Sequence, residues 1–211
     1  MNTKENIIEK TIERFESYIE NHGCTTRGVN WKDEDNHTIR FKQLLKLIEE
    51  KENFTLNDLG CGYGALYSFM LQNGYKKFKY NGYDVVEKFI KNAQASFKTD
   101  ENAAFYKVND HKDLKMADYT IGCGLMSYKY SHKEHEWLSY ILEIIEYMNL
   151  NSLKGFSFNI LTIYSDVDKR KACNYYADPL FFFDYCKRNY SKNVALLHDY
   201  NLYDFTIIVR K

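Results

Sequence analysis

The sequence predicts an α/β fold: a doubly wound, mostly parallel seven-stranded sheet that ends in an antiparallel hairpin and carries an N-terminal helical cap. Three observations predict it. Short apolar strands alternate with amphipathic helices, glycines cluster where the first strand passes into a helix, and the last two apolar runs flank a short turn-rich stretch. Strands that alternate with helices are typical of a parallel sheet covered on both faces. A closing hairpin adds antiparallel strands at one edge.

The expected cap comprises residues 1–35. Apolar residues between positions 7 and 19 recur every three or four residues, which indicates an amphipathic helix. A loop at residues 22–28 follows, and a second apolar stripe between positions 39 and 48 predicts another helix. Because no linker-like stretch divides the rest of the 211-residue chain, we expect residues 36–211 to form one compact domain.

The remaining elements follow in order from changes of hydrophobic period. The expected strands are residues 54–59, 78–84, 104–108, 117–121, 155–163, 194–197 and 205–209. The expected helices after the first strand surround residues 66–71, 89–93, 137–145 and 180–185.

Composition excludes several classes of function. Lys plus Arg and Asp plus Glu both total 29, so the chain lacks the net positive charge that is typical of nucleic-acid binders, and a small-molecule partner is favoured. No apolar run approaches the roughly 18 residues of a membrane span. The five cysteines include no CxxC pair, so we expect neither a metal site nor disulfides, and a cytoplasmic location. The oligomeric state stays open.

The glycine cluster is the strongest functional signal. Gly60, Gly62 and Gly64 follow the first predicted strand, where glycines permit a tight turn and let a ligand approach the backbone. Asp58 precedes the cluster, and Asp84 ends the next strand twenty residues after Gly64. An acidic residue there can accept hydrogen bonds from ribose hydroxyls. A nucleotide-like ligand is therefore expected at the carboxyl ends of these strands.

These features also suit a nicotinamide-dependent oxidoreductase, which is one alternative. The dinucleotide fingerprint, however, is GxGxxG, and Ala65 occupies the place of its third glycine. The closing hairpin also leaves no second mononucleotide-binding half.

Four segments together resemble class I S-adenosylmethionine-dependent methyltransferases, which have a Rossmann-like fold. The segment Asp58-Leu59-Gly60-Cys61-Gly62-Tyr63-Gly64 is similar to that family's first motif, and Asn81-Gly82-Tyr83-Asp84 to its ribose-binding motif. Asn109-Asp110 is similar to the adenine-contacting position, and Gly122-Cys123-Gly124-Leu125 to the segment beside the methionine moiety. The resemblance covers residues 36–211.

The resemblance implies S-adenosylmethionine as cofactor and assigns its contacts. Asp84 is expected at the ribose diol, Asp110 at the adenine and the 60–64 backbone at the methionine portion. Arg40 resembles a residue that some members aim at the cofactor carboxylate, although a solvated helix arginine is the alternative; Trp31 covers the cofactor or merely packs. The full expected set is Asp58, Gly60, Cys61, Gly62, Gly64, Asp84, Val85, Asp110, His111, Gly122, Arg40 and Trp31.

The acceptor is less closely defined. The Asp/Asn-Pro-Pro-aromatic motif of methyltransferases acting on adenine or glutamine nitrogens is missing, because the single proline is Pro179. We expect O- or N-methylation of a small molecule, and a resemblance to small bacterial methyltransferases of polysaccharide-biosynthesis loci suggests a sugar building block. His132 is the candidate general base, and Tyr128, Tyr164 and Tyr176 are candidate substrate contacts. A cofactor-binding module that has lost catalysis is a further alternative.

Overall fold

The strands occur in the predicted order and form one sheet. The structure, a computed structural model, describes residues 3–29, 34–110 and 112–211. Its strands are β1 (Thr55–Leu59), β2 (Lys79–Asp84), β3 (Ala103–Lys107), β4 (Ala117–Gly122), β5 (Ser152–Leu161), β6 (Asn193–Leu197) and β7 (Asp204–Arg210). Their spatial order is β3-β2-β1-β4-β5-β7-β6. The order reverses beside β1 and β4, where open α/β sheets bind their ligands.

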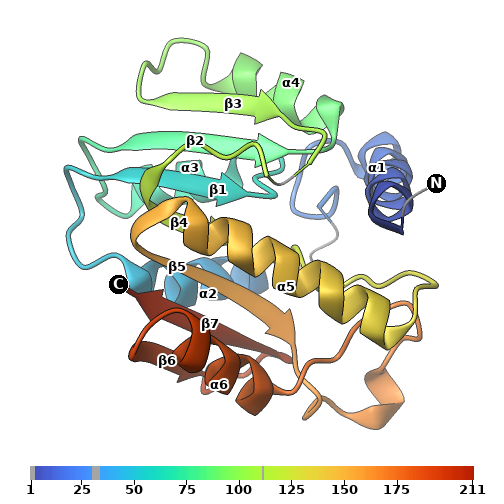
Figure 1. Ribbon diagram of the computed structural model, residues 1–211. Coiled ribbons are helices and arrows are strands. Elements are labelled where there is room, and N and C mark those ends of the chain that lie inside the picture. The colour runs from blue at the N-terminus through green and yellow to red at the C-terminus, as the bar shows by residue number, and fades with distance from the viewer. Residues whose placement is uncertain (1–2, 30–33, 111) are drawn as a thin grey trace.

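The predicted mixture of parallel and antiparallel strands is confirmed. β1 to β5 pair in parallel, whereas β7 pairs antiparallel with both β5 and β6. The second strand of the closing hairpin, β7, therefore lies between β5 and the first strand of the hairpin, β6 (Figure 1). The parallel strands all end at the same edge of the sheet.

Helices cover both faces of the sheet. They are α1 (Thr3–His22), α2 (Glu34–Leu44), α3 (Ala65–Gln72), α4 (Glu87–Ser96), α5 (Glu134–Leu150) and α6 (Pro179–Asn189). In Figure 1, α5 and α6 lie in front of the sheet and α2 and α3 behind it. The second predicted helix is shorter than expected, because α2 ends at Leu44 and a 3-10 turn, Leu45–Leu47, follows.

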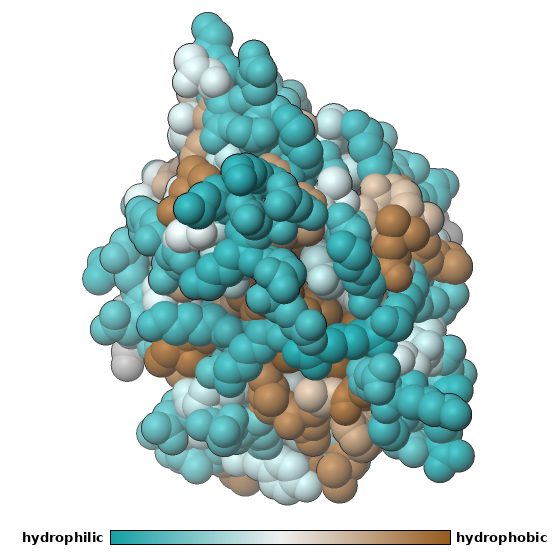
Figure 2. Space-filling model, turned by 90° about the vertical axis from the view of Figure 1, so that its left-hand side faces the viewer, coloured by the Kyte–Doolittle hydropathy of each residue, from teal (hydrophilic) through white to brown (hydrophobic). Residues whose placement is uncertain are grey.

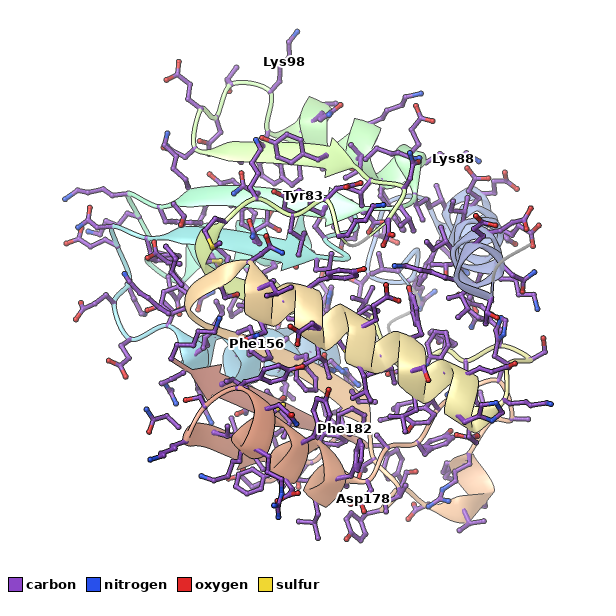
Figure 3. The ribbon with its side chains drawn as sticks, in the orientation of Figure 1. Tyr83, Lys88, Lys98, Phe156, Asp178 and Phe182 are labelled. Carbon is purple, nitrogen blue, oxygen red and sulfur yellow. The ribbon has the colours of Figure 1, made fainter. Side chains whose placement is uncertain are left out.

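The core has two layers, one on each face of the sheet. Phe156 and Phe182 are fully buried between β5 and α6 (Figure 3), in the layer that also holds the apolar face of α5. Leu66, Tyr67 and Met70 of α3 belong to the second layer, behind the sheet. These rings and aliphatic side chains fix the strands whose carboxyl ends carry the expected site.

Helix α1 lies across the end of the sheet at which β1 to β3 terminate (Figure 1). Phe15 packs against Phe89 of α4 with ring centroids 6.0 Å apart, and Lys88, on the α1 side of the molecule in Figure 3, pairs with Glu20 at 3.0 Å. On its other flank, Lys10 donates to the Ser131 hydroxyl at 2.8 Å. The helix therefore bridges the segments that follow β2 and β4.

The opposite end of the molecule, where the parallel strands begin, is largely hydrophilic with smaller hydrophobic areas (Figure 2). No helix within the described residues is both long and apolar enough to cross a membrane.

Candidate active site

A cavity lies beneath α1 at the carboxyl ends of β1, β2 and β4; together with the open solvent at its mouth it encloses about 970 Å³ of space. Its walls come from many parts of the chain, among them α1, α2, the glycine loop and the start of α3, the β2–α4 segment, the segment after β4, and α5. Several predicted cofactor residues line it, namely Asp58, Gly60, Cys61, Gly62, Asp84 and Val85. Segments far apart in sequence thus meet where the order of strands reverses.

The glycine loop has a backbone that side chains would disturb. Gly62 has φ +53° and Gly64 has φ +86°, in the left-handed region that favours glycine. A Cβ on Gly64 would stand 2.8 Å from a ring atom of Phe97. Gly64 does not line the cavity, so its part in the loop is to let α3 begin directly after the turn.

Asp84 connects the end of β2 to this loop. Its Oδ2 accepts from the Gly62 backbone N–H at 2.9 Å, and its Oδ1 accepts from that of Val86 at 2.8 Å. The side chain is buried, which raises its pKa to about 6 although these N–H donors favour the ionised form. Because each carboxylate oxygen accepts two hydrogen bonds, Asp84 keeps acceptor capacity toward the cavity.

Asp58 is a second buried carboxyl group in the same cavity. The Tyr80 hydroxyl donates to its Oδ2, and 2% of the residue is exposed. Burial raises the pKa of Asp58 to about 7, the Tyr80 hydrogen bond opposes the shift, and the charge of Asp84 adds to it. Two acidic groups therefore share one largely buried site, which favours a ligand that carries positive charge.

Helix α2 contributes a wall that the sequence analysis did not identify. His37 and Phe41, one helical turn apart, both line the cavity, and their ring centroids are 4.2 Å apart. Burial and the nearby Arg40 guanidinium lower the pKa of His37 to about 3, so its imidazole is neutral at physiological pH. With a pKa this low, the imidazole is a weak base and serves the wall as a neutral polar ring. The spacing of four residues was the signal that could have placed these two side chains on one face.

Arg40 lies outside the cavity lining, in a buried ion pair. Its guanidinium contacts the carboxylate of Asp204 at the start of β7, with 8% and 1% of the two residues exposed. Burial raises the pKa of Asp204, and the Arg40 charge opposes that shift. On neighbouring β5, the Asn159 Oδ1 accepts from the Gly124 N–H at 2.8 Å. These contacts hold α2 and the loop after β4 against the sheet.

Other expected cofactor contacts lie at the margin of the cavity or outside the described residues. Asp110 forms an ion pair with Lys4 of α1 at 2.7 Å and does not line the cavity. Gly122 ends β4 and is buried; a Cβ there would meet the Met148 side chain at 3.5 Å, and Gly122 does not line the cavity. The expected contacts Trp31 and His111 lie outside the described residues. Their roles stay predictions.

The candidate substrate residues are divided by the fold. Tyr128 lines the cavity, and the Arg14 guanidinium carbon is 3.9 Å from its ring centroid. Tyr164 is 64% exposed, and the Tyr176 hydroxyl accepts from the Lys171 N–H at 2.8 Å; neither lines the cavity. The candidate base His132 is also outside the lining, and its Nδ1 lies 3.9 Å from a carboxylate oxygen of Glu136.

The cavity fits a cationic nucleoside ligand. Its glycine turn lets a ligand approach the backbone, Asp84 can accept from vicinal hydroxyls, and Asp58 adds negative charge. Within the described residues, no group of three or more His, Cys, Asp or Glu side chains could hold a metal ion.

Comparison with known proteins gives one close relative in sequence. No protein-family model matches the chain. The protein named "Putative methyltransferase Rv1506c" from Mycobacterium tuberculosis (strain ATCC 25618 / H37Rv) is 42% identical over 167 residues, which are 79% of this chain and 99% of that protein.

Solved structures share the fold at low identity. Magnesium protoporphyrin IX methyltransferase (ChlM) from Synechocystis PCC 6803 with bound SAH has a TM-score of 0.62 and 13% identity, covering 84% of each chain. The DhpI–SAH complex has a TM-score of 0.64 and 9% identity over 95% of each chain. Human N-acetylserotonin methyltransferase in complex with SAM has a TM-score of 0.58 and 14% identity, covering 97% of this chain and 66% of the human chain.

Proposed function

The chain belongs to the family of the mycobacterial protein named "Putative methyltransferase Rv1506c", and from this premise we propose that it is an S-adenosylmethionine-dependent methyltransferase acting on a small molecule. Its fold is that of class I methyltransferases, and the three solved structures named above contain S-adenosylmethionine or S-adenosylhomocysteine. The observation that carries the proposal is the cavity formed by the glycine loop, Asp58 and Asp84.

Residues of this chain supply specific contacts in the proposal. Asp84 receives the ribose hydroxyls, the loop around Gly62 holds the methionine portion through its backbone, and Asp58 faces the positive charge. Bound S-adenosylmethionine supplies an activated methyl group on a sulfonium. The chain contributes alignment, which can lower a reaction barrier by about 7–11 kcal/mol. His37 is a neutral polar group in the cavity wall.

Calorimetric titration tests the proposal. We expect the wild-type protein to bind S-adenosylmethionine and S-adenosylhomocysteine with 1:1 stoichiometry, and to bind NADH at least a hundredfold more weakly, because the loop lacks the dinucleotide fingerprint. Tight NADH binding without S-adenosylmethionine binding would instead favour the oxidoreductase alternative. Binding without transfer to any acceptor would favour the non-catalytic module.

We also expect cofactor affinity to depend on pH. As the pH falls from 8 to 6, Asp58, with a pKa of about 7, takes up a proton before Asp84, with a pKa of about 6. The cavity then loses negative charge, and S-adenosylmethionine, whose sulfonium is cationic, binds more weakly, whereas neutral S-adenosylhomocysteine is affected less. Calorimetry at pH 6 and 8 measures both dissociation constants, and Asp58→Asn should flatten the difference. Equal pH responses for the two ligands would contradict this prediction.

Asp58 and Asp84 also determine the direction in which the free energy of unfolding of the ligand-free protein changes with pH. Both pKa values lie above the ordinary value of about 3.9 for an aspartate. The folded protein therefore binds more protons than the unfolded chain between about pH 4 and pH 7, and the contribution of these groups to stability falls as pH rises through that window.

A further inference from the structure

Part of the cavity wall is not used by the proposed cofactor contacts, and it is aromatic. The segment after β4 contributes Tyr128 and Tyr130, α5 contributes Trp137 and Tyr140, and α1 contributes Phe15. Aromatic faces bury large apolar areas, and they attract other rings in stacked or edge-to-face arrangements.

The polar atoms of this wall are engaged within the protein. Trp137 Nε1 donates to the Met126 carbonyl at 2.9 Å. The Tyr130 hydroxyl donates to Thr11 Oγ1 at 3.0 Å, and Thr11 Oγ1 itself donates to the Ile7 carbonyl at 2.8 Å. The wall therefore presents ring faces and hydrocarbon to the cavity more than hydrogen-bonding groups.

The charges of the residues that line the cavity also disfavour an anionic ligand. Among the described residues that line the cavity, the acidic side chains are Asp58 and Asp84, and there is no lysine or arginine. Arg14 lies over the Tyr128 ring but does not itself line the cavity. An acceptor whose charge is a phosphate or a carboxylate would approach two buried carboxyl groups without a lining Lys or Arg, at a high cost in electrostatic free energy, whereas the carboxylate of S-adenosylmethionine is accompanied by that molecule's own ammonium and sulfonium charges.

We propose that the methyl acceptor is an uncharged small molecule with a flat, largely apolar ring, which carries the hydroxyl or amine that is methylated and packs against the Tyr128, Tyr130 and Trp137 wall. This inference rests on the proposed function, because it concerns the second ligand of the same cavity. It departs from the sugar expected from the sequence. A sugar brings several hydroxyls, each of which needs a partner when it is buried, and the ring wall offers few.

Matched probes of different charge test the inference on protein saturated with S-adenosylhomocysteine. The probes are 2-naphthol, 2-naphthoate and methyl glucoside, titrated by calorimetry at pH 7.5. We expect the Kd of 2-naphthol to be at least tenfold lower than those of the other two. Tyr128→Leu should weaken 2-naphthol binding at least fivefold. The control Tyr203→Leu, at a half-exposed tyrosine outside the cavity lining, should leave it unchanged.

Each other outcome has a distinct meaning. Failure of S-adenosylhomocysteine to bind overturns the proposed function and this inference together. If S-adenosylhomocysteine binds, then equal or tighter binding of 2-naphthoate or methyl glucoside, or binding of none of the probes, overturns only the acceptor class. Tighter 2-naphthoate binding that is lost in Arg14→Met would assign the acceptor site to an anion held by Arg14.

Discussion

Replacing Asp84 with alanine is expected to raise the Kd for S-adenosylmethionine at least about a hundredfold. Its carboxylate is positioned by the Gly62 and Val86 N–H groups and retains acceptor capacity toward the cavity. Hydrogen bonds to a charged group contribute about 1.5–3 kcal/mol each. The loss of two, one to each ribose hydroxyl, therefore corresponds to at least two powers of ten in Kd.

The matched control is Asp118 at the start of β4. Its Oδ2 also accepts from a backbone N–H, that of Thr55 at 2.8 Å, but at the opposite end of the sheet. Asp118→Ala should leave the Kd for S-adenosylmethionine unchanged. Because Asp84→Ala also removes the contact to Gly62, Asp84→Asn provides a second variant with nearly the same shape. Unchanged affinity in a folded Asp84→Ala protein would contradict the assignment.

Replacing Asp204 with leucine is expected to lower the free energy of unfolding by about 3–5 kcal/mol, because the change leaves the buried Arg40 guanidinium without its carboxylate. An arginine stays charged at any pH a protein tolerates. The opposite change, Arg40→Met, should cost less, because Asp204, with its raised pKa, can take up a proton and become neutral.

Urea unfolding at pH 7 of wild type, both single variants and the Arg40→Met/Asp204→Leu double variant measures this asymmetry. The double variant should be more stable than Asp204→Leu alone, since an apolar pair avoids the unpaired charge. A double variant whose loss equals the sum of the two single losses would show that the two side chains do not act as a pair.

Local sequence spacing placed Asp58, Gly60, Gly62 and Asp84 correctly on one end of the sheet. Their positions follow from the ends of two neighbouring parallel strands, and strand ends can be read from the hydrophobic period. The same reasoning predicted the terminal hairpin, because its two strands are close in the chain. What it could not predict is which side chains distant elements bring over those strand ends.

His37 and Arg40 show this limit. Both lie on α2. Arg40 contacts Asp204 of β7, which is 164 positions later in the chain, whereas His37 lines the cavity. Similarly, the ion pair between Asp110 and Lys4 joins residues more than a hundred positions apart. Strand β5 begins at Ser152 and not at residue 155, because Ser152 pairs with Ala117 of β4 ahead of a shift in register, where the apolar pattern is weak.

The Arg40–Asp204 pair also bears on how the chain matures during synthesis. Because Arg40 is synthesised well before β7, its guanidinium stays in water or in loosely packed structure until the closing hairpin has formed. Contacts of such long sequence separation slow folding. The position of α2, and with it this part of the cavity wall, is therefore fixed only after the closing hairpin has been made and has paired with β5.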